Sequence, residues 1–236
     1  MTVMQSDLYA ARSAMGYGGT FYGAYPALVT DIADPEGQGR VRIRLPWSPD
    51  SEDAVFEVWA RQATLMAGSG RGSWFVPDVN DEVLVVFEGG NPRRPYVIGA
   101  LWNGVDAPPE EMDSSGENAI KAIHSRNGIT ITLDDTNGSE TLKLETPGGQ
   151  TVTLRDGEAG IEVADANGNT LEFSASGVTV TSPGTVSVSA SLVEVSAGMV
   201  KVDAGMSRFS GIVQADTIIT NSVVSASYTP GAGNIW

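Results

Sequence analysis

The chain has 236 residues, a net charge of −15, 41% hydrophobic residues and no cysteine. This apolar content excludes a fully disordered chain, and the lack of cysteine excludes disulfides and thiolate metal sites. Residues 1–104 contain 8 basic and 12 acidic residues and residues 105–236 contain 6 and 17, which gives −4 and −11. Such an acidic surface repels phosphates, so we expect neither nucleic acid nor an anionic lipid surface as a specific partner.

Residues 1–24 show no clear hydrophobic period and are interpreted as an N-terminal arm. They lack the basic and apolar regions of a secretion signal, and no run of about 18 apolar residues follows in the chain. We therefore expect a protein that is in the cytoplasm when it is assembled.

Residues 25–104 contain five short alternating runs bounded by turn residues, which predict five strands. The runs are YPALVTDIAD, GRVRIRLPW, FEVWARQAT, DEVLVVFEGG and RPYVIGALWNG. Five strands in a segment of this length indicate a small closed β-barrel of the oligonucleotide/oligosaccharide-binding (OB) type.

In GRVRIRLPW the apolar and basic residues alternate, so Val41, Ile43 and Leu45 are predicted to face the barrel core. Arg40, Arg42 and Arg44 then face outward. A basic row on an OB barrel can bind single-stranded nucleic acid. The acidic residues interleaved with it favour ion pairs with neighbouring carboxylates or contact with a protein instead.

Residues 105–128 combine paired prolines, an acidic cluster and Ser/Gly steps, which predicts a linker. Its last part contains His124, the chain's one histidine. A single histidine without cysteine partners does not predict a metal site, and no nucleophile or orienting acid completes a catalytic triad. We therefore expect no metal, no cofactor and no catalytic residues.

Residues 129–225 contain repeated pairs of apolar residues two positions apart. The first pairs are Ile129-x-Ile131-x-Leu133, Leu142-x-Leu144, Val152-x-Leu154, Ile161-x-Val163 and Leu171-x-Phe173. Two-residue spacing places both side chains on one face of a strand, whereas on a helix they diverge. The interval between pairs is about ten residues at first and is expected to be seven or eight from Val180 onward, so these residues predict a stacked β spike.

A seven-residue unit forms only one side of a prism, so a single chain cannot enclose its own apolar residues. Leaving them in water forfeits roughly 25 cal/mol per Å² of apolar surface. Three copies can close a triangular prism, which predicts an obligate homotrimer and a trimeric intertwined β-helix. The predicted trimer core consists of Val178, Val180, Val186, Val188, Val193, Val195, Val200 and Val202. Ser187, Glu194 and Lys201 are predicted to face outward.

Residues 226–236 change to a Gly/Pro segment that ends in Ile235 and Trp236. The last layer of a stacked β structure leaves unpaired backbone that needs a cover. Trp236 can fold back as a cap, or Ile235 and Trp236 can contact a separate tip protein; the sequence leaves both open.

Three ordered motifs resemble one family. GRVRIRLPW, WFVPDVNDEVLVVF and NPRRPYVIGALWN, followed by a β repeat, are similar to the spike proteins of contractile injection systems, including phage baseplate spikes and valine-glycine repeat (VgrG) proteins. The resemblance covers residues 25–110 by motif and 129–225 by architecture.

This resemblance implies a trimeric needle that a contracting sheath drives through a target envelope, with only transient contact to the membrane. It implies a baseplate hub protein at the barrel and, since no His-x-His tip motif is present, a separate proline-alanine-alanine-arginine-repeat (PAAR) type tip protein. The large hub domains of VgrG proteins and a lysozyme-like insertion are not found in this sequence, so we expect the hub on another chain. A cargo or effector is a further implied partner, and the finished needle belongs to a virion or phage-tail-like particle.

Two other functions remain open from the residues themselves. Parallel β-helices include polysaccharide-cleaving enzymes, and Asp134 and Asp135 supply paired carboxylates. Adjacent strand residues face opposite sides, however, and DDTNG is a good turn, which disfavours catalysis. A trimeric adhesin or receptor-binding fibre is the other alternative, and the amino-terminal barrel favours the spike over it.

Overall fold

The computed structural model describes residues 20–46, 56–157 and 160–227. The chain divides after Gly184 into two units, which are considered separately. Within the described ranges the single helix is the three-residue 3-10 helix η1 (Glu88–Gly90). No helix formed by these residues has the length and apolar character of a membrane span.

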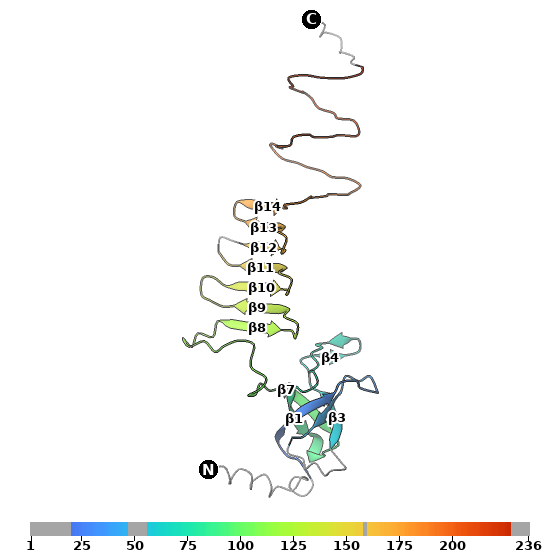
Figure 1. Ribbon diagram of the computed structural model, residues 1–236, viewed down its shortest axis with the longest axis vertical. Coiled ribbons are helices and arrows are strands. Elements are labelled where there is room, and N and C mark those ends of the chain that lie inside the picture. Colours follow the sequence, from blue (N-terminus) through green and yellow to red (C-terminus); the bar gives the residue numbers. More distant parts are fainter. Residues whose placement is uncertain (1–19, 47–55, 158–159, 228–236) are drawn as a thin grey trace. The chain divides into compact units, whose positions relative to one another are not determined.

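The amino-terminal strands close into a barrel with the order β1-β2-β3-β7-β6 (Figure 1). Its strands are β1 (Ala24–Asp31), β2 (Val41–Arg44), β3 (Glu57–Gln62), β6 (Glu82–Phe87) and β7 (Pro95–Ala100). All neighbouring strands are antiparallel except β3 and β7, which pair in parallel. The five predicted strands and the OB-type barrel are confirmed.

Alternation of side chains along the strands fills the barrel core. Val41, Ile43 and Leu45 are buried as predicted. They pack with Ala27, Val29, Ala60, Val83, Val85, Phe87 and Val97. Each large aliphatic side chain that is fully buried contributes about 1.5 to 3 kcal/mol relative to an exposed one. Two of the three predicted outward arginines pair with carboxylates: Arg42 lies 2.8 Å from Glu57, and Arg40 lies 2.7 Å from Asp34.

Two parts of the barrel region differ from the predicted boundaries. Phe21 was assigned to the N-terminal arm, but it is buried in the barrel core and its ring lies 5.2 Å from that of Phe87. The backbone N–H of Phe21 donates to the Gly90 carbonyl at 2.8 Å, so the barrel includes this residue. An arm that carries the short strands β4 (Ala67–Gly68) and β5 (Arg71–Gly72) was also not predicted.

The next part of the chain is a seven-stranded antiparallel sheet whose strands stack in chain order from β8 to β14 (Figure 1). The strands are β8 (Ile120–His124), β9 (Thr130–Asp134), β10 (Thr141–Glu145), β11 (Thr151–Arg155), β12 (Ile161–Ala164), β13 (Thr170–Ser174) and β14 (Gly177–Thr181). Six of them match predicted apolar pairs. The predicted linker, 105–128, is wrong at its end, because β8 already belongs to the sheet and pairs with β9.

The second unit begins at Thr185, and its described residues, 185–227, form extended segments joined by bends. None of these described residues belongs to a hydrogen-bonded strand pair, so their backbone has no sheet partner within the chain. Every one of them is exposed. In Figure 1 this segment is the brown trace.

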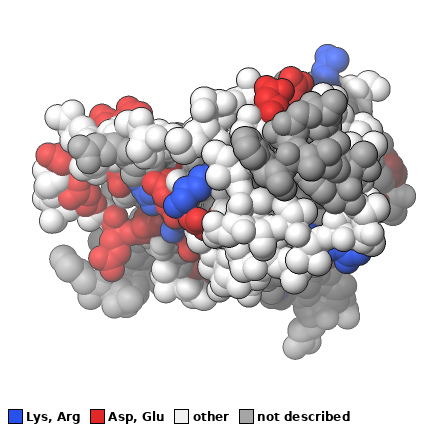
Figure 2. Space-filling view, turned by 90° about the horizontal axis from the view of Figure 1, so that it is seen from above, with Lys and Arg blue, Asp and Glu red and all other residues white. Residues whose placement is uncertain are grey.

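Acidic groups dominate the charge of the molecule. Figure 2 shows several clusters of acidic side chains, with few basic groups among them. This distribution agrees with the net charge of −15.

Candidate assembly surface

Two columns of apolar side chains cross one face of the β8–β14 sheet. Residues directly opposite one another in antiparallel strands lie on the same face. The register therefore aligns one column of Ile123, Ile131, Leu144, Val152, Val163, Leu171 and Val180, and a second of Leu133, Leu142, Leu154, Ile161, Phe173 and Val178. Most of these side chains are exposed in the single chain, from 37% at Ile131 to 61% at Val178. We call this surface the apolar face.

The opposite face of the sheet is polar. Thr132, Lys143, Thr153, Glu162 and Glu172 follow one another across it in register. Ion pairs join Lys143 to Glu145 at 2.5 Å and Arg155 to Glu162 at 3.0 Å. A sheet with one apolar and one polar face buries the apolar side against another layer and keeps the polar side in water.

Equivalent hairpin turns at 125–129, 146–150 and 165–169 keep the columns in register. In each turn the first residue donates its backbone N–H to the fifth residue and accepts from the glycine at position four. These glycines have φ of 80° to 85°, a region that glycine adopts without steric cost. A Cβ on Gly149 would lie 3.3 Å from the Cβ of Ala166 in the next turn, so the turns pack on one another along this edge.

The first part of the second unit repeats every seven residues. Bends fall at Gly184, Ser191, Gly198 and Gly205, and one predicted valine pair lies in each intervening segment. Lys201 and Asp203 form an ion pair at 2.6 Å, so both lie on one side of their segment. Alternation then places Val200 and Val202 on the other side.

Beyond Gly205 the interval shortens. Bends at Gly211, Asp216, Asn221 and Ala226 are five residues apart, so the predicted spacing of seven or eight is wrong for this part. Its aliphatic residues are adjacent rather than alternate. One member of each pair is 56–70% exposed and the other 95–99%, the less exposed being Val213, Ile218 and Val223 and the more exposed Ile212, Ile219 and Val224.

The predicted site residues fall into two groups. The eight valines of the predicted trimer core are 60–73% exposed in the single chain. Val178 and Val180 lie at the ends of the two apolar columns, and the other six lie in the second unit. Their burial in a trimer stays a prediction. Ile235 and Trp236, the predicted tip contact, lie outside the described residues.

Ile123 belongs to the apolar face but was not predicted from the sequence. Ile123 lies opposite Ile131 in the register of β8 and β9. The segment IKAIH contains no two-residue apolar pair, because its isoleucines are three positions apart. Ile123 lies two residues before the turn that begins at Ser125, just as Leu144 lies two residues before the turn that begins at Thr146. This repeated spacing is the signal that could have indicated Ile123.

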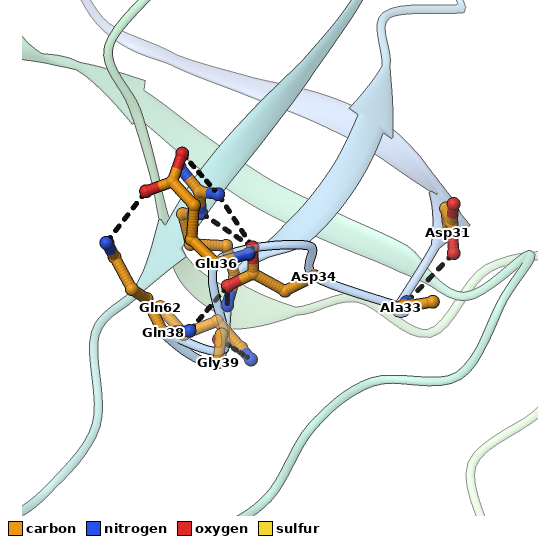
Figure 3. Close-up of polar contacts among 8 residues, drawn as sticks. Asp31, Ala33, Asp34, Glu36, Gln38, Gly39 and Gln62 are labelled. Carbon is orange, nitrogen blue, oxygen red and sulfur yellow. Dashed lines mark hydrogen bonds and ion pairs between the residues drawn. The ribbon is translucent and has the colours of Figure 1, made fainter.

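A second ordered feature is the loop between β1 and β2, which Asp34 organises (Figure 3). Its carboxylate accepts backbone hydrogen bonds from Gln38 at 2.7 Å and Glu36 at 3.1 Å, and the Arg40 guanidinium lies 2.7 Å away. The hydrogen bond from Arg40 is the largest cause that holds the pKa of Asp34 well below its usual range. The Gln62 side chain also donates to the Gly39 carbonyl at 2.8 Å, which ties the loop to β3.

The titratable residues considered for catalysis have partners elsewhere. His124 Nε2 lies 3.0 Å from Glu110 Oε1, and Asp135 pairs with Lys121 at 2.8 Å. Asp134 accepts a hydrogen bond from the Thr136 hydroxyl, which lowers its pKa. Across the described ranges, no group of three or more His, Cys, Asp or Glu residues is placed to hold a metal ion.

Comparison with known families gives two matches. Residues 25–102 match the type VI secretion system/phage-baseplate injector OB domain, which coincides with the barrel. Residues 141–206 match the phage baseplate V C-terminal trimerisation domain, which includes most of the apolar face and the first part of the second unit.

Individual relatives give the same result. The type VI secretion system spike protein VgrG1b of Pseudomonas aeruginosa is 26% identical over 141 residues, which are 54% of this chain and 19% of that protein. VgrG4b of the same organism is 31% identical over 109 residues, covering 44% of this chain and 14% of that protein. The actin cross-linking toxin VgrG1 of Vibrio cholerae is 25% identical over 128 residues, covering 50% of this chain and 12% of that protein. The chain thus spans a fifth or less of the length of these relatives.

The fold and these matches define an OB-type injector domain joined to a β domain that matches a trimerisation domain. The chain is similar to phage baseplate V proteins in both parts and to VgrG spike proteins over about half of its length, and the resemblance seen in the sequence is confirmed.

Proposed function

We propose that the chain forms a homotrimeric spike, the central needle of a contractile injection system or phage-tail-like baseplate. The observation that carries this proposal is the apolar face, most of which lies within the match to a trimerisation domain and is exposed in a single chain. Burying its columns and the valine pairs against two further copies recovers roughly 25 cal/mol per Å² of apolar surface. The OB match at the barrel supports the spike over an adhesin or fibre.

The proposed role is mechanical and not enzymatic. Relatives that match about half of the chain carry the name of spike proteins, which supports a structural role. One relative is named an actin cross-linking toxin, but this chain covers only 12% of that protein. The carboxylates considered for catalysis hold a turn and an ion pair, which also supports a structural role.

The proposed partners follow the order of the chain. A baseplate hub protein binds the barrel, and a PAAR-type tip protein covers the C-terminal end through Ile235 and Trp236. A cargo or effector travels with the needle, which is assembled in the cytoplasm and contacts the target membrane only during penetration.

The experiment is a mass measurement combined with imaging. Light scattering of the purified chain is expected to give three times the chain mass at micromolar concentration. Antibody labelling of the source's particles in negative stain is expected at the baseplate end. A stable monomer, or labelling at distal fibres, would contradict the proposal.

A further inference from the structure

A groove of about 680 Å³ lies between the β1–β2 loop, the end of β3 and the arm that carries β4 and β5. This volume falls in the range of about 300 to 1,000 Å³ that binding sites occupy. Its lining includes Gly39, Gln62, Met66, Arg71, Trp74 and Phe75. The spike function proposed above does not use it.

The floor of the groove is ordered before anything binds. Asp34 fixes the β1–β2 loop, and Gln62 holds the Gly39 carbonyl (Figure 3). A Cβ on Gly39 would lie 3.0 Å from the ring of Trp74, so the loop and this wall are in close contact. A preformed floor reduces the entropy lost when a partner is ordered.

The wall of the groove is aromatic and basic. The residues Trp74 and Phe75 are 76% and 73% exposed, which is unusual for side chains of this size. Arg61 and Arg71 are the charged residues of the lining, and none of the described lining residues is acidic. Exposed tryptophan, phenylalanine and arginine together are typical of the centre of protein interfaces.

Residues 105–117 have the complementary chemistry. Their sequence, VDAPPEEMDSSGE, has five acidic residues and no basic one. Val105 and Met112 are 92% and 95% exposed, so the segment also presents apolar side chains. The Pro108–Pro109 pair restricts the backbone, and proline-containing segments bind aromatic grooves at a low entropic cost.

We propose that residues 105–117 of a neighbouring copy occupy this groove in the trimer, with Met112 against Trp74 and Phe75 and the acidic side chains toward Arg71. The inference rests on the trimer proposed above. Glu110 is tied to His124 of its own β8 at 3.0 Å, which anchors the segment on the sheet whose apolar face the copies share. Three grooves and three segments then close a cyclic arrangement in which each copy clasps the next.

The test uses the absence of cysteine from the chain. Ala67 lies on β4 in the groove lining, so chains carrying Ala67→Cys and chains carrying Met112→Cys, each with a different tag, are co-expressed and oxidised. A disulfide between the two differently tagged chains is expected. A double variant with Ala67→Cys and Met112→Cys in the same chain is expected to give covalent species of up to three chains on denaturing gels. Met112→Cys paired with Ser187→Cys, on the outward side of the spike, is the control and is expected to give no product.

In the double variant, a disulfide formed only within one chain would overturn the proposal. The absence of any disulfide between the co-expressed chains would overturn it as well. Light scattering on the same samples separates the causes, because a trimer without cross-links contradicts only the clasp, whereas a monomer contradicts the spike. Arg71→Glu is expected to lower the cross-linking yield about two- to fivefold, the range of an exposed ion pair. Glu111→Arg in the same chain is expected to restore it, and failure of both effects would remove the assigned charge contact.

Discussion

Gly160 lies against the backbone of Phe173, so closely that a Cβ on Gly160 would overlap the Phe173 carbonyl oxygen. Gly160 also has a φ of 56°, in the left-handed region, and it precedes β12, which pairs with β13. Gly160→Ala is therefore expected to destabilise the sheet by more than the roughly 1 to 2 kcal/mol that the left-handed backbone conformation alone costs a residue with a Cβ.

Gly138→Ala is the matched control, because Gly138 has a φ of 78° but open space around its Cβ position. Thermal unfolding followed by circular dichroism compares the two. Equal decreases of Tm would show that the contact with Phe173 is not a constraint.

Val195→Asp is expected to abolish the trimer. Val195 is a predicted core residue, so the substitution places three carboxylates close together on the shared axis, and each unpaired buried charge costs about 3 to 5 kcal/mol. Its neighbour Glu194 is predicted to face outward, and Glu194→Ala is expected to leave the mass by light scattering unchanged. Similar tolerance at both positions would refute the assignment of faces.

Val213 and Ile212 test the assignment of inward and outward faces in the part of the chain where the bends are five residues apart. Val213 is 56% exposed and Ile212 99%, and the core valines upstream span 60–73%. We therefore expect Val213 to face the axis and Ile212 to face outward. Val213→Asp should weaken the trimer in sedimentation velocity at submicromolar concentration, while Ile212→Asp should not, and the reverse order would mean that the faces exchange beyond Gly205.

Asp34 predicts the response of the barrel to acid. Its pKa is lowered in the folded chain from an ordinary value of 3.8, chiefly by the hydrogen bond from Arg40. A lowered pKa means that the ionised carboxylate stabilises the fold above about pH 3.8 and that this contribution is lost as the pH falls further. Asp34→Asn is expected to lower Tm at pH 7 and to flatten its decline below pH 4 in tryptophan fluorescence. An unchanged profile would mean that Asp34 does not couple protonation to folding.

Deletion of residues 226–236 tests the C-terminal segment. The repeated segments that carry the aliphatic residues, as far as Val224, all lie before it, so light scattering of the truncated chain should still give a trimer. Binding of a PAAR-type tip protein, measured by calorimetry, is expected to weaken at least tenfold, which corresponds to about 1.4 kcal/mol. Undiminished affinity would remove Ile235 and Trp236 from the contact.

Local alternation was sufficient to predict most strands. The barrel strands and β9 to β14 each contain apolar residues two positions apart, and this period is a property of the strand itself. The inward direction of Val41 and Ile43 followed from the same rule, and both are fully buried.

Features that depend on distant partners could not be predicted in this way. Phe21 enters the core through a backbone pair with Gly90, which local sequence does not encode. The strands β4 and β5 are short and rich in glycine, so they have no apolar period, and β8 was hidden by the three-residue spacing of its isoleucines. The groove beside Trp74 joins three separate segments, and no single motif indicates it.

For the proposed trimer, the hydrogen bonding of the two β regions predicts an order of assembly. Strands β8 to β14 find their partners in the same polypeptide, so this sheet can form on a freshly made subunit. Residues 185–227 have no such partners among the described residues, so we expect their backbone to pair only between the copies of the proposed trimer. We therefore expect the proposed trimer to assemble from the sheet, as its nucleus, toward the C-terminal end.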